Sequence, residues 1–154
     1  MRCSALLLCC LIPLVQADDL GLQPVDERGC ILGHGTIQAP TLTLMAAAYG
    51  ESEQRNAVAL AKIEEALDAG CPIDAVDQVG LSALNGAILY NEPVLVKLLL
   101  ARGADPQRRI VSTSGANGLD SFAFLDLLQQ RDKQRDRSAI KALLTEHGAQ
   151  VSGQ

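Results

Sequence analysis

One segment, residues 77–106, constrains the fold more than any other part of the chain. It reads DQVGLSALNGAILYNEPVLVKLLLARGADP, and Ser82 stands where a helix N-cap accepts hydrogen bonds from the first free amides. Apolar residues three and four positions apart predict two short helices, separated at Asn91 and restarted at Pro93. Gly103 is expected to end the second helix, because glycine adopts the left-handed conformation without a steric penalty.

The glycine stop and the apolar stripe recur along the chain. Gly103 follows Gly70 by 33 residues, and an earlier copy of the pattern occupies residues 41–74. A later, degraded copy occupies residues 118–150. Both outer copies carry extra residues between their helices, which we expect to lengthen a helix or to form a longer turn. Units this small bury their apolar sides only against neighbouring units, so the pattern predicts stacked layers of helices.

The central unit resembles one ankyrin repeat, a family with a period of about 33 residues. The family pattern is Asp-x-x-Gly-x-Thr-Pro-Leu-His-x-Ala-Ala-x-x-Gly, followed by Val-x-x-Leu-Leu-x-x-Gly-Ala-Asp. Ten positions match it in register: Asp77, Gly80, Leu84, Ala87, Val96, Leu99, Leu100, Gly103, Ala104 and Asp105. The tetrapeptide Thr-Pro-Leu-His is replaced here by Ser-Ala-Leu-Asn at 82–85. A generic helical hairpin with coincident glycines is the alternative.

This resemblance covers most of the chain and implies an all-α fold. The expected domain, 41–150, is an ankyrin-type α-solenoid of three helix-turn-helix repeats with short β-like turns. Its repeats would lie at about 41–74, 77–106 and 118–150. The preceding segment, 18–40, is rich in Gly and Pro, and we expect it to form an irregular N-terminal cap over the first repeat.

The first 17 residues have the features of a signal peptide. A positive start at Arg2 precedes an almost unbroken apolar run, and Ala17 ends a site of small residues suited to cleavage. The run is too short to span a bilayer, so we expect no stable membrane anchor. A buried or anchoring N-terminal helix is the alternative. Cleavage after Ala17 would deliver the chain to the periplasm.

Two of the five cysteines, Cys30 and Cys71, lie outside that segment. An exported chain enters an oxidising compartment, where two cysteines can pair. Two separate buried thiols are an equally supported alternative from the sequence. We expect a Cys30–Cys71 disulfide in exported material.

Composition and motifs exclude several function classes. The formal charge of −5 and the lack of a basic patch make nucleic acid an unexpected partner. His34 lies in a Gly-rich turn, and His147 precedes Gly148, which is expected to end the last helix. Neither histidine has sequence neighbours that complete a metal site or a catalytic set. We therefore expect no enzymatic activity, no metal and no cofactor.

Binding of another protein is what the resemblance implies. In ankyrin repeats the inner helices and turn tips form a concave binding surface, and the matching exposed positions here are Tyr49, Leu89, Tyr90 and Leu128. Tyrosine suits such a surface because it joins apolar area to a polar tip. The alternative is that these side chains are buried between repeats. The extra residues at 51–55 and 129–137 offer a second candidate surface, or else solvated spacers.

These inferences lead to one expected function and one alternative. The expected function is a periplasmic adaptor or scaffold that acts as a monomer, since some exported bacterial ankyrin proteins support partner enzymes. The alternative is an immunity protein, whose acidic charge would steer it to a basic toxin cleft. An enzyme is the least supported class.

Overall fold

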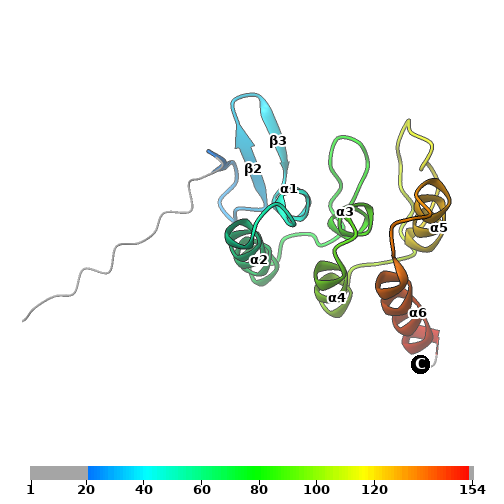
Figure 1. Ribbon diagram of the computed structural model, residues 1–154. Coiled ribbons are helices and arrows are strands. Elements are labelled where there is room, and N and C mark those ends of the chain that lie inside the picture. Colours follow the sequence, from blue (N-terminus) through cyan, green and yellow to red (C-terminus); the bar gives the residue numbers. More distant parts are fainter. Residues whose placement is uncertain (1–20, 153–154) are drawn as a thin grey trace, which may run out of the picture.

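The computed structural model describes residues 21–152, which form six helices and one three-stranded antiparallel sheet (Figure 1). The expected signal peptide, 1–17, lies outside these residues. The elements are β1 (Gln23–Pro24), β2 (Ile31–His34), β3 (Ile37–Pro40), α1 (Thr41–Ala48), α2 (Glu53–Asp68), α3 (Ala83–Tyr90), α4 (Pro93–Ala101), α5 (Ser121–Arg131) and α6 (Ser138–Ser152).

The helices pack as three antiparallel pairs that follow the order of the chain. Helix α1 contacts α2, α3 contacts α4, and α5 contacts α6. The first helices of the pairs lie side by side, since α3 touches both α1 and α5, and α4 packs along α6 (Figure 1). The loops before α3 and α5 project from one side of this array, and the β2–β3 hairpin projects on the same side.

Local signals place the central pair where the sequence predicts it. The Ser82 hydroxyl accepts from the Asn85 amide at 3.3 Å and caps α3. Asn91 ends α3 in the left-handed conformation, with φ of 67°, and Pro93 opens α4. Gly103 follows α4 with φ of 92°, a value that glycine tolerates better than any other residue. These four local predictions are confirmed.

The expectation of an all-α solenoid is wrong, because part of the segment 18–40 forms the sheet. Strand β2 pairs with β1 on one side and β3 on the other, and a two-residue turn opening with Gly35 (φ 60°) joins β2 to β3. These strands have two to four residues, too few to show an alternating apolar pattern. The fold is therefore mixed α/β.

The length of α2 and the end of α6 decide two further expectations. The extra residues of the first pair lengthen its second helix, since α2 runs for 16 residues from Glu53. The expected stop at Gly148 is wrong, because α6 continues to Ser152. A Cβ at Gly148 would lie 3.5 Å from the Phe122 ring of α5, an ordinary contact distance. Packing against α5 thus supports the last turns of α6 despite the glycine.

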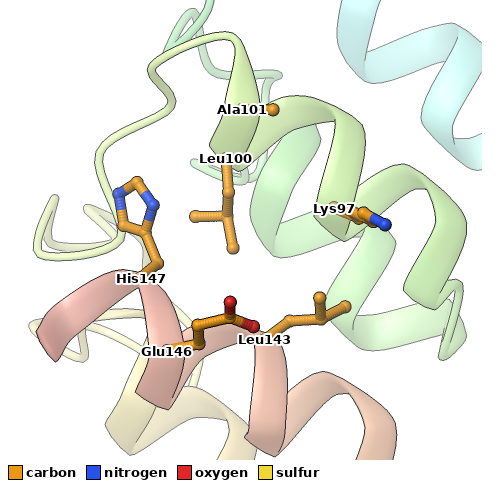
Figure 2. A pocket seen from close by; sticks show the side chains of 6 residues that line it. All are labelled: Lys97, Leu100, Ala101, Leu143, Glu146 and His147. Carbon is orange, nitrogen blue, oxygen red and sulfur yellow. The ribbon is translucent and has the colours of Figure 1, made fainter. Parts of the chain in front are cut away.

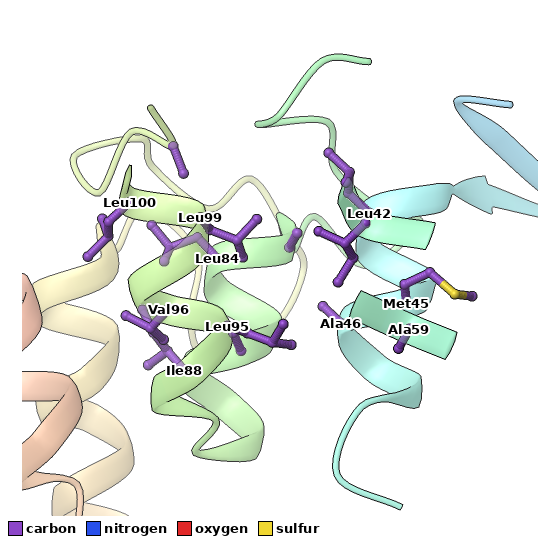
Figure 3. Packing of buried hydrophobic residues seen from close by; sticks show 14 of the residues in the cluster. Leu42, Met45, Ala46, Ala59, Leu84, Ile88, Leu95, Val96, Leu99 and Leu100 are labelled. Atoms are coloured by element: carbon purple, nitrogen blue, oxygen red, sulfur yellow. The ribbon is translucent and has the colours of Figure 1, made fainter. Parts of the chain in front are cut away.

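Aliphatic side chains dominate the core, which is continuous through all three pairs. The side chains of Leu84, Leu95 and Leu99 are fully buried between α3 and α4 (Figure 3). Leu42 and Ala46 of α1 occupy the neighbouring layer. Small residues let these layers approach closely, since a Cβ at Gly86 of α3 would lie 3.8 Å from that of Ala46.

Candidate functional site

The projecting elements leave a hollow between the hairpin and the loop at 74–82, which we call the first loop. This hairpin-side hollow has a volume of about 240 Å³. Strand β3, helix α1 and the first loop contribute its lining residues: Ile37, Gln38, Ala39, Thr43, Leu44, Ala47, Asp77, Gln78 and Val79. Asp77, its one carboxylate among the described residues, already accepts from the amides of Val79 and Leu81 at 2.9 Å. Apolar atoms and amides therefore dominate what this hollow offers to a ligand.

A second hollow lies between the first loop and the loop at 106–120, which we call the second loop. This loop-side hollow has a volume of about 250 Å³. Its lining residues come from both loops and from α3 and α5: Val79, Leu81, Leu89, Ser114, Gly115, Ala116, Phe124, Leu127, Leu128 and Arg131. Arg131 is its only charged lining residue among the described part of the chain.

Val79 joins the two hollows into one apolar surface, because its side chain lines both. Its side chain is 59% exposed, and Ile37 at the hairpin is 62% exposed. Both are β-branched aliphatic residues on projecting elements, Ile37 at the start of β3 and Val79 in the turn of the first loop, where the core does not bury them. We call the lining of both hollows the inner surface. Exposed apolar residues gathered around hollows are typical of interaction sites.

The structure brings together two of the four predicted binding residues. Leu89 of α3 and Leu128 of α5 both line the loop-side hollow. Tyr90 ends α3 and is 46% exposed, while Tyr49 follows α1 and is partly buried against the core. Neither tyrosine lines either hollow.

Sequence reasoning missed Val79 and Ile37. A signal for Val79 was present, since it lies between Gln78 and Gly80 in a turn, away from any helix face that could bury it. Ile37 could not be placed without knowing that its segment forms a hairpin.

Arg137 holds the carbonyl end of α3, next to Leu89. Its guanidinium donates to the carbonyl oxygens of Ile88 (2.6 Å) and Leu89 (3.3 Å), although it belongs to the connection between α5 and α6. The Arg137 side chain is buried, so the expectation that all of 129–137 is solvated is wrong at this position. Burial lowers the pKa of Arg137, and the nearby charge of Arg135 lowers it further. The contact fixes one wall of the loop-side hollow.

A disulfide between Cys30 and Cys71 holds the sheet against the first helix pair. Cys30 immediately precedes β2, and Cys71 follows the end of α2. The two cysteines are 41 residues apart in the sequence. Next to the bridge, Thr41 donates its amide to the Cys30 carbonyl at 2.8 Å. The bridge therefore fixes the hairpin that supplies Ile37, Gln38 and Ala39 to the hairpin-side hollow.

A third hollow lies on the other side of the molecule, between α4 and α6 (Figure 2). It has a volume of about 210 Å³, and Leu100 and Leu143 point into it from the two helices. Lys97, Glu146 and His147 stand around it. His147 thus lies within a continuing helix rather than before a helix stop. This outer hollow contains none of the four predicted binding residues.

Comparison of the chain with protein-family models, curated proteins and solved structures found no match. Within residues 21–152, no three or more His, Cys, Asp or Glu side chains are grouped so that they could hold a metal ion. No helix in this range combines the length and apolar character needed to cross a membrane.

Proposed function

We propose that this protein binds another protein through its inner surface, as a periplasmic adaptor or scaffold without catalytic activity. The observation that carries the proposal is the pair of apolar hollows joined at the exposed side chain of Val79. Burying such a surface would release about 25 cal/mol for each Å² of apolar area removed from water. The resemblance of residues 77–106 to an ankyrin repeat supports the same proposal, since that family acts by binding proteins.

Charge distribution favours an adaptor over a toxin-neutralising role. The described lining of the two inner hollows holds one carboxylate, Asp77, and one guanidinium, Arg131. Exposed acidic side chains gather instead on α2: Glu53, Glu64, Glu65 and Asp68. An inner surface with so little net charge gives no electrostatic steering toward a basic cleft.

The location in the periplasm has two supports. The disulfide between Cys30 and Cys71 suits an oxidising compartment, because cytosolic reductants keep most thiols reduced. The apolar run before Ala17 is of a length typical of signal peptides.

A charge placed at the centre of the inner surface tests this function. Val79→Asp should reduce partner capture from a periplasmic extract by at least roughly tenfold, since it buries a carboxylate in an apolar contact. The matched control is Val94→Asp on α4, because Val94 is 56% exposed and lines none of the three hollows. Equal capture by both variants would refute the proposed surface.

Tyr90 lies outside the inner surface but directly follows the lining residue Leu89, so it gives a separate test of how far the contact extends. Because Tyr90 is 46% exposed at the end of α3, Tyr90→Ala should weaken capture with little effect on folding. Capture and thermal unfolding measured on the same preparation separate the two effects. Unchanged capture would show that Tyr90 does not contact the partner. The proposed binding surface would then consist of the two hollows alone.

A further inference from the structure

We propose that the open edge of β3 pairs with an extended segment of the partner, which adds a strand between the hairpin and the first loop. The inference rests on the proposed function, because it states how part of the partner's chain would be held. It concerns the main-chain groups of Gln38 and the hairpin-side hollow beside them.

Strand β3 is an edge strand, since the sheet order is β1-β2-β3. Gln38 stands opposite Gly33 of β2. The Gln38 carbonyl accepts a long hydrogen bond, 3.4 Å, from the side-chain amide of Gln78 in the first loop, so this carbonyl faces away from β2. In an antiparallel ladder the N–H and C=O of one residue point to the same side. The N–H of Gln38 therefore also faces the open edge, and an edge of this kind is a template for another strand.

One glutamine side chain bridges the space between this edge and the first loop. A glutamine side chain reaches about 5 Å from its Cα, so the hydrogen bond places the Gln78 backbone within roughly 8 Å of the Gln38 carbonyl oxygen. An added strand would lie about 4.8 Å from β3, in the place that the Gln78 side chain now occupies. A helix, about 10 Å wide with its side chains, would not fit. Displacing the single long side-chain bond of Gln78 would open the path for an extended chain.

The first and second loops approach each other more closely than the first loop approaches the hairpin. A Cβ at Gly80 of the first loop would collide with the carbonyl oxygen of Val111 in the second loop. The two loops are thus in backbone contact at Gly80 and Val111, so a strand could not pass between their backbones at this point. Among the described residues, one hydrogen bond, from Gln78 to Gln38, joins the first loop to the hairpin. Strand addition is therefore specific to the hairpin side.

The hollow beside the edge defines the side chains of the added strand. Successive residues of a strand point to opposite sides, so every second side chain would enter the hollow over Leu44, Ala47 and Val79. Asp77, the only carboxylate in the described lining of this hollow, is already hydrogen-bonded to two backbone amides. The segment that fits is extended, with aliphatic or β-branched residues at alternate positions and without proline at the pairing positions.

Amide NMR with a synthetic peptide tests this pairing without the natural partner. The probe is a heptapeptide of alternating Thr and Val, blocked at both ends, added at up to millimolar concentration to the disulfide-bonded chain. We expect shifts at the amides of 37–39 and 77–79, and a loss of roughly tenfold in affinity when the pairing amides of the peptide are N-methylated. No shifts, or shifts centred on other residues, would overturn the proposal.

Two variants at one position separate main-chain pairing from side-chain contact. Gln38→Pro removes the edge N–H, and proline is tolerated on an edge strand. Gln38→Ala removes the side chain but keeps the N–H. We expect the peptide to bind the alanine variant as tightly as the native chain or more tightly, and the proline variant roughly tenfold more weakly. Equal binding by both variants would overturn strand addition.

The outcomes for the two proposals are distinct. A natural partner whose capture depends on Val79 but is the same for both Gln38 variants supports the proposed function and refutes strand addition. The absence of any Val79-dependent partner would refute the proposed function, while the peptide titration alone would decide whether the edge of β3 accepts a strand.

Discussion

At the scale of single residues, backbone conformation decides which glycines can be replaced. Gly103 has a φ of 92°, where a Cβ is strained, whereas Gly148 lies inside α6 with helical conformation. Gly148→Ala should raise the free energy of unfolding by about 0.5–1 kcal/mol, because alanine loses less conformational freedom in a helix. Gly103→Ala should instead destabilise the protein by a similar or larger amount. Urea denaturation of both variants checks the pair, and a destabilising Gly148→Ala would contradict the helical placement.

Asp136 gives a pH-dependent prediction at the start of α6. Its carboxylate accepts from the Ser138 amide at 2.9 Å, and this hydrogen bond lowers the pKa of Asp136 below its ordinary 3.8. A lowered folded pKa means that the stabilisation is present above pH 3.8 and is lost as the pH falls through the folded value. Asp136→Ala should therefore be less stable than the native chain at pH 7, with a difference that narrows in strong acid.

Asp136→Asn is the control for that titration. The amide oxygen can still accept from Ser138, but it carries no charge that titrates. At pH 7, the free energy of unfolding of Asp136→Asn should lie closer to that of the native chain than the free energy of unfolding of Asp136→Ala does. A gap between the native and alanine chains that stays constant from neutral to strongly acidic pH would contradict the assigned role of the carboxylate.

At the scale of elements, the connection between α5 and α6 is anchored by Arg137. Replacing Arg137 by Ala leaves the carbonyls of Ile88 and Leu89 without these donors, so unfolding should become easier by about 1–3 kcal/mol. The exposed Arg135 is the control, and Arg135→Ala should change stability by less than about 0.5 kcal/mol. Chemical denaturation measures the free energy of unfolding of both variants. Equal effects would mean that Arg137 is as solvated as the sequence suggests.

The elements also show how far sequence reasoning reaches. The central pair was predictable because Ser82, Asn91, Pro93 and Gly103 are local signals, each acting within a few residues of itself. The sheet was not, because its short strands are stabilised by pairing and by the distant Cys71. The burial of Arg137 depends on carbonyls 48 and 49 residues away, so no window of the sequence reveals it. In the candidate site, the inner-helix residues Leu89 and Leu128 were predictable, but the hairpin side was not.

At the scale of the whole molecule, the disulfide couples the sheet to the helices. Replacing Cys30 and Cys71 by serine should lower the free energy of unfolding by about 2–4 kcal/mol, because the open chain gains freedom in the unfolded state. Hydrogen exchange should rise in β2 and β3 more than in α3 and α4. Unchanged protection of the strands would show that their own contacts suffice to hold the sheet.

The central claim is that the inner surface, rather than the outer helices, contacts a partner protein. Site-specific photocrosslinking in the cells that produce the protein tests it most directly, with the reactive group placed in turn at Ile37, Val79 and Val94. These side chains are 62%, 59% and 56% exposed, so accessibility to solvent does not favour one position. The account predicts a covalent adduct with the same protein from Ile37 and Val79 and none from Val94. An adduct from Val94 alone, or equal adducts from all three positions, would contradict it.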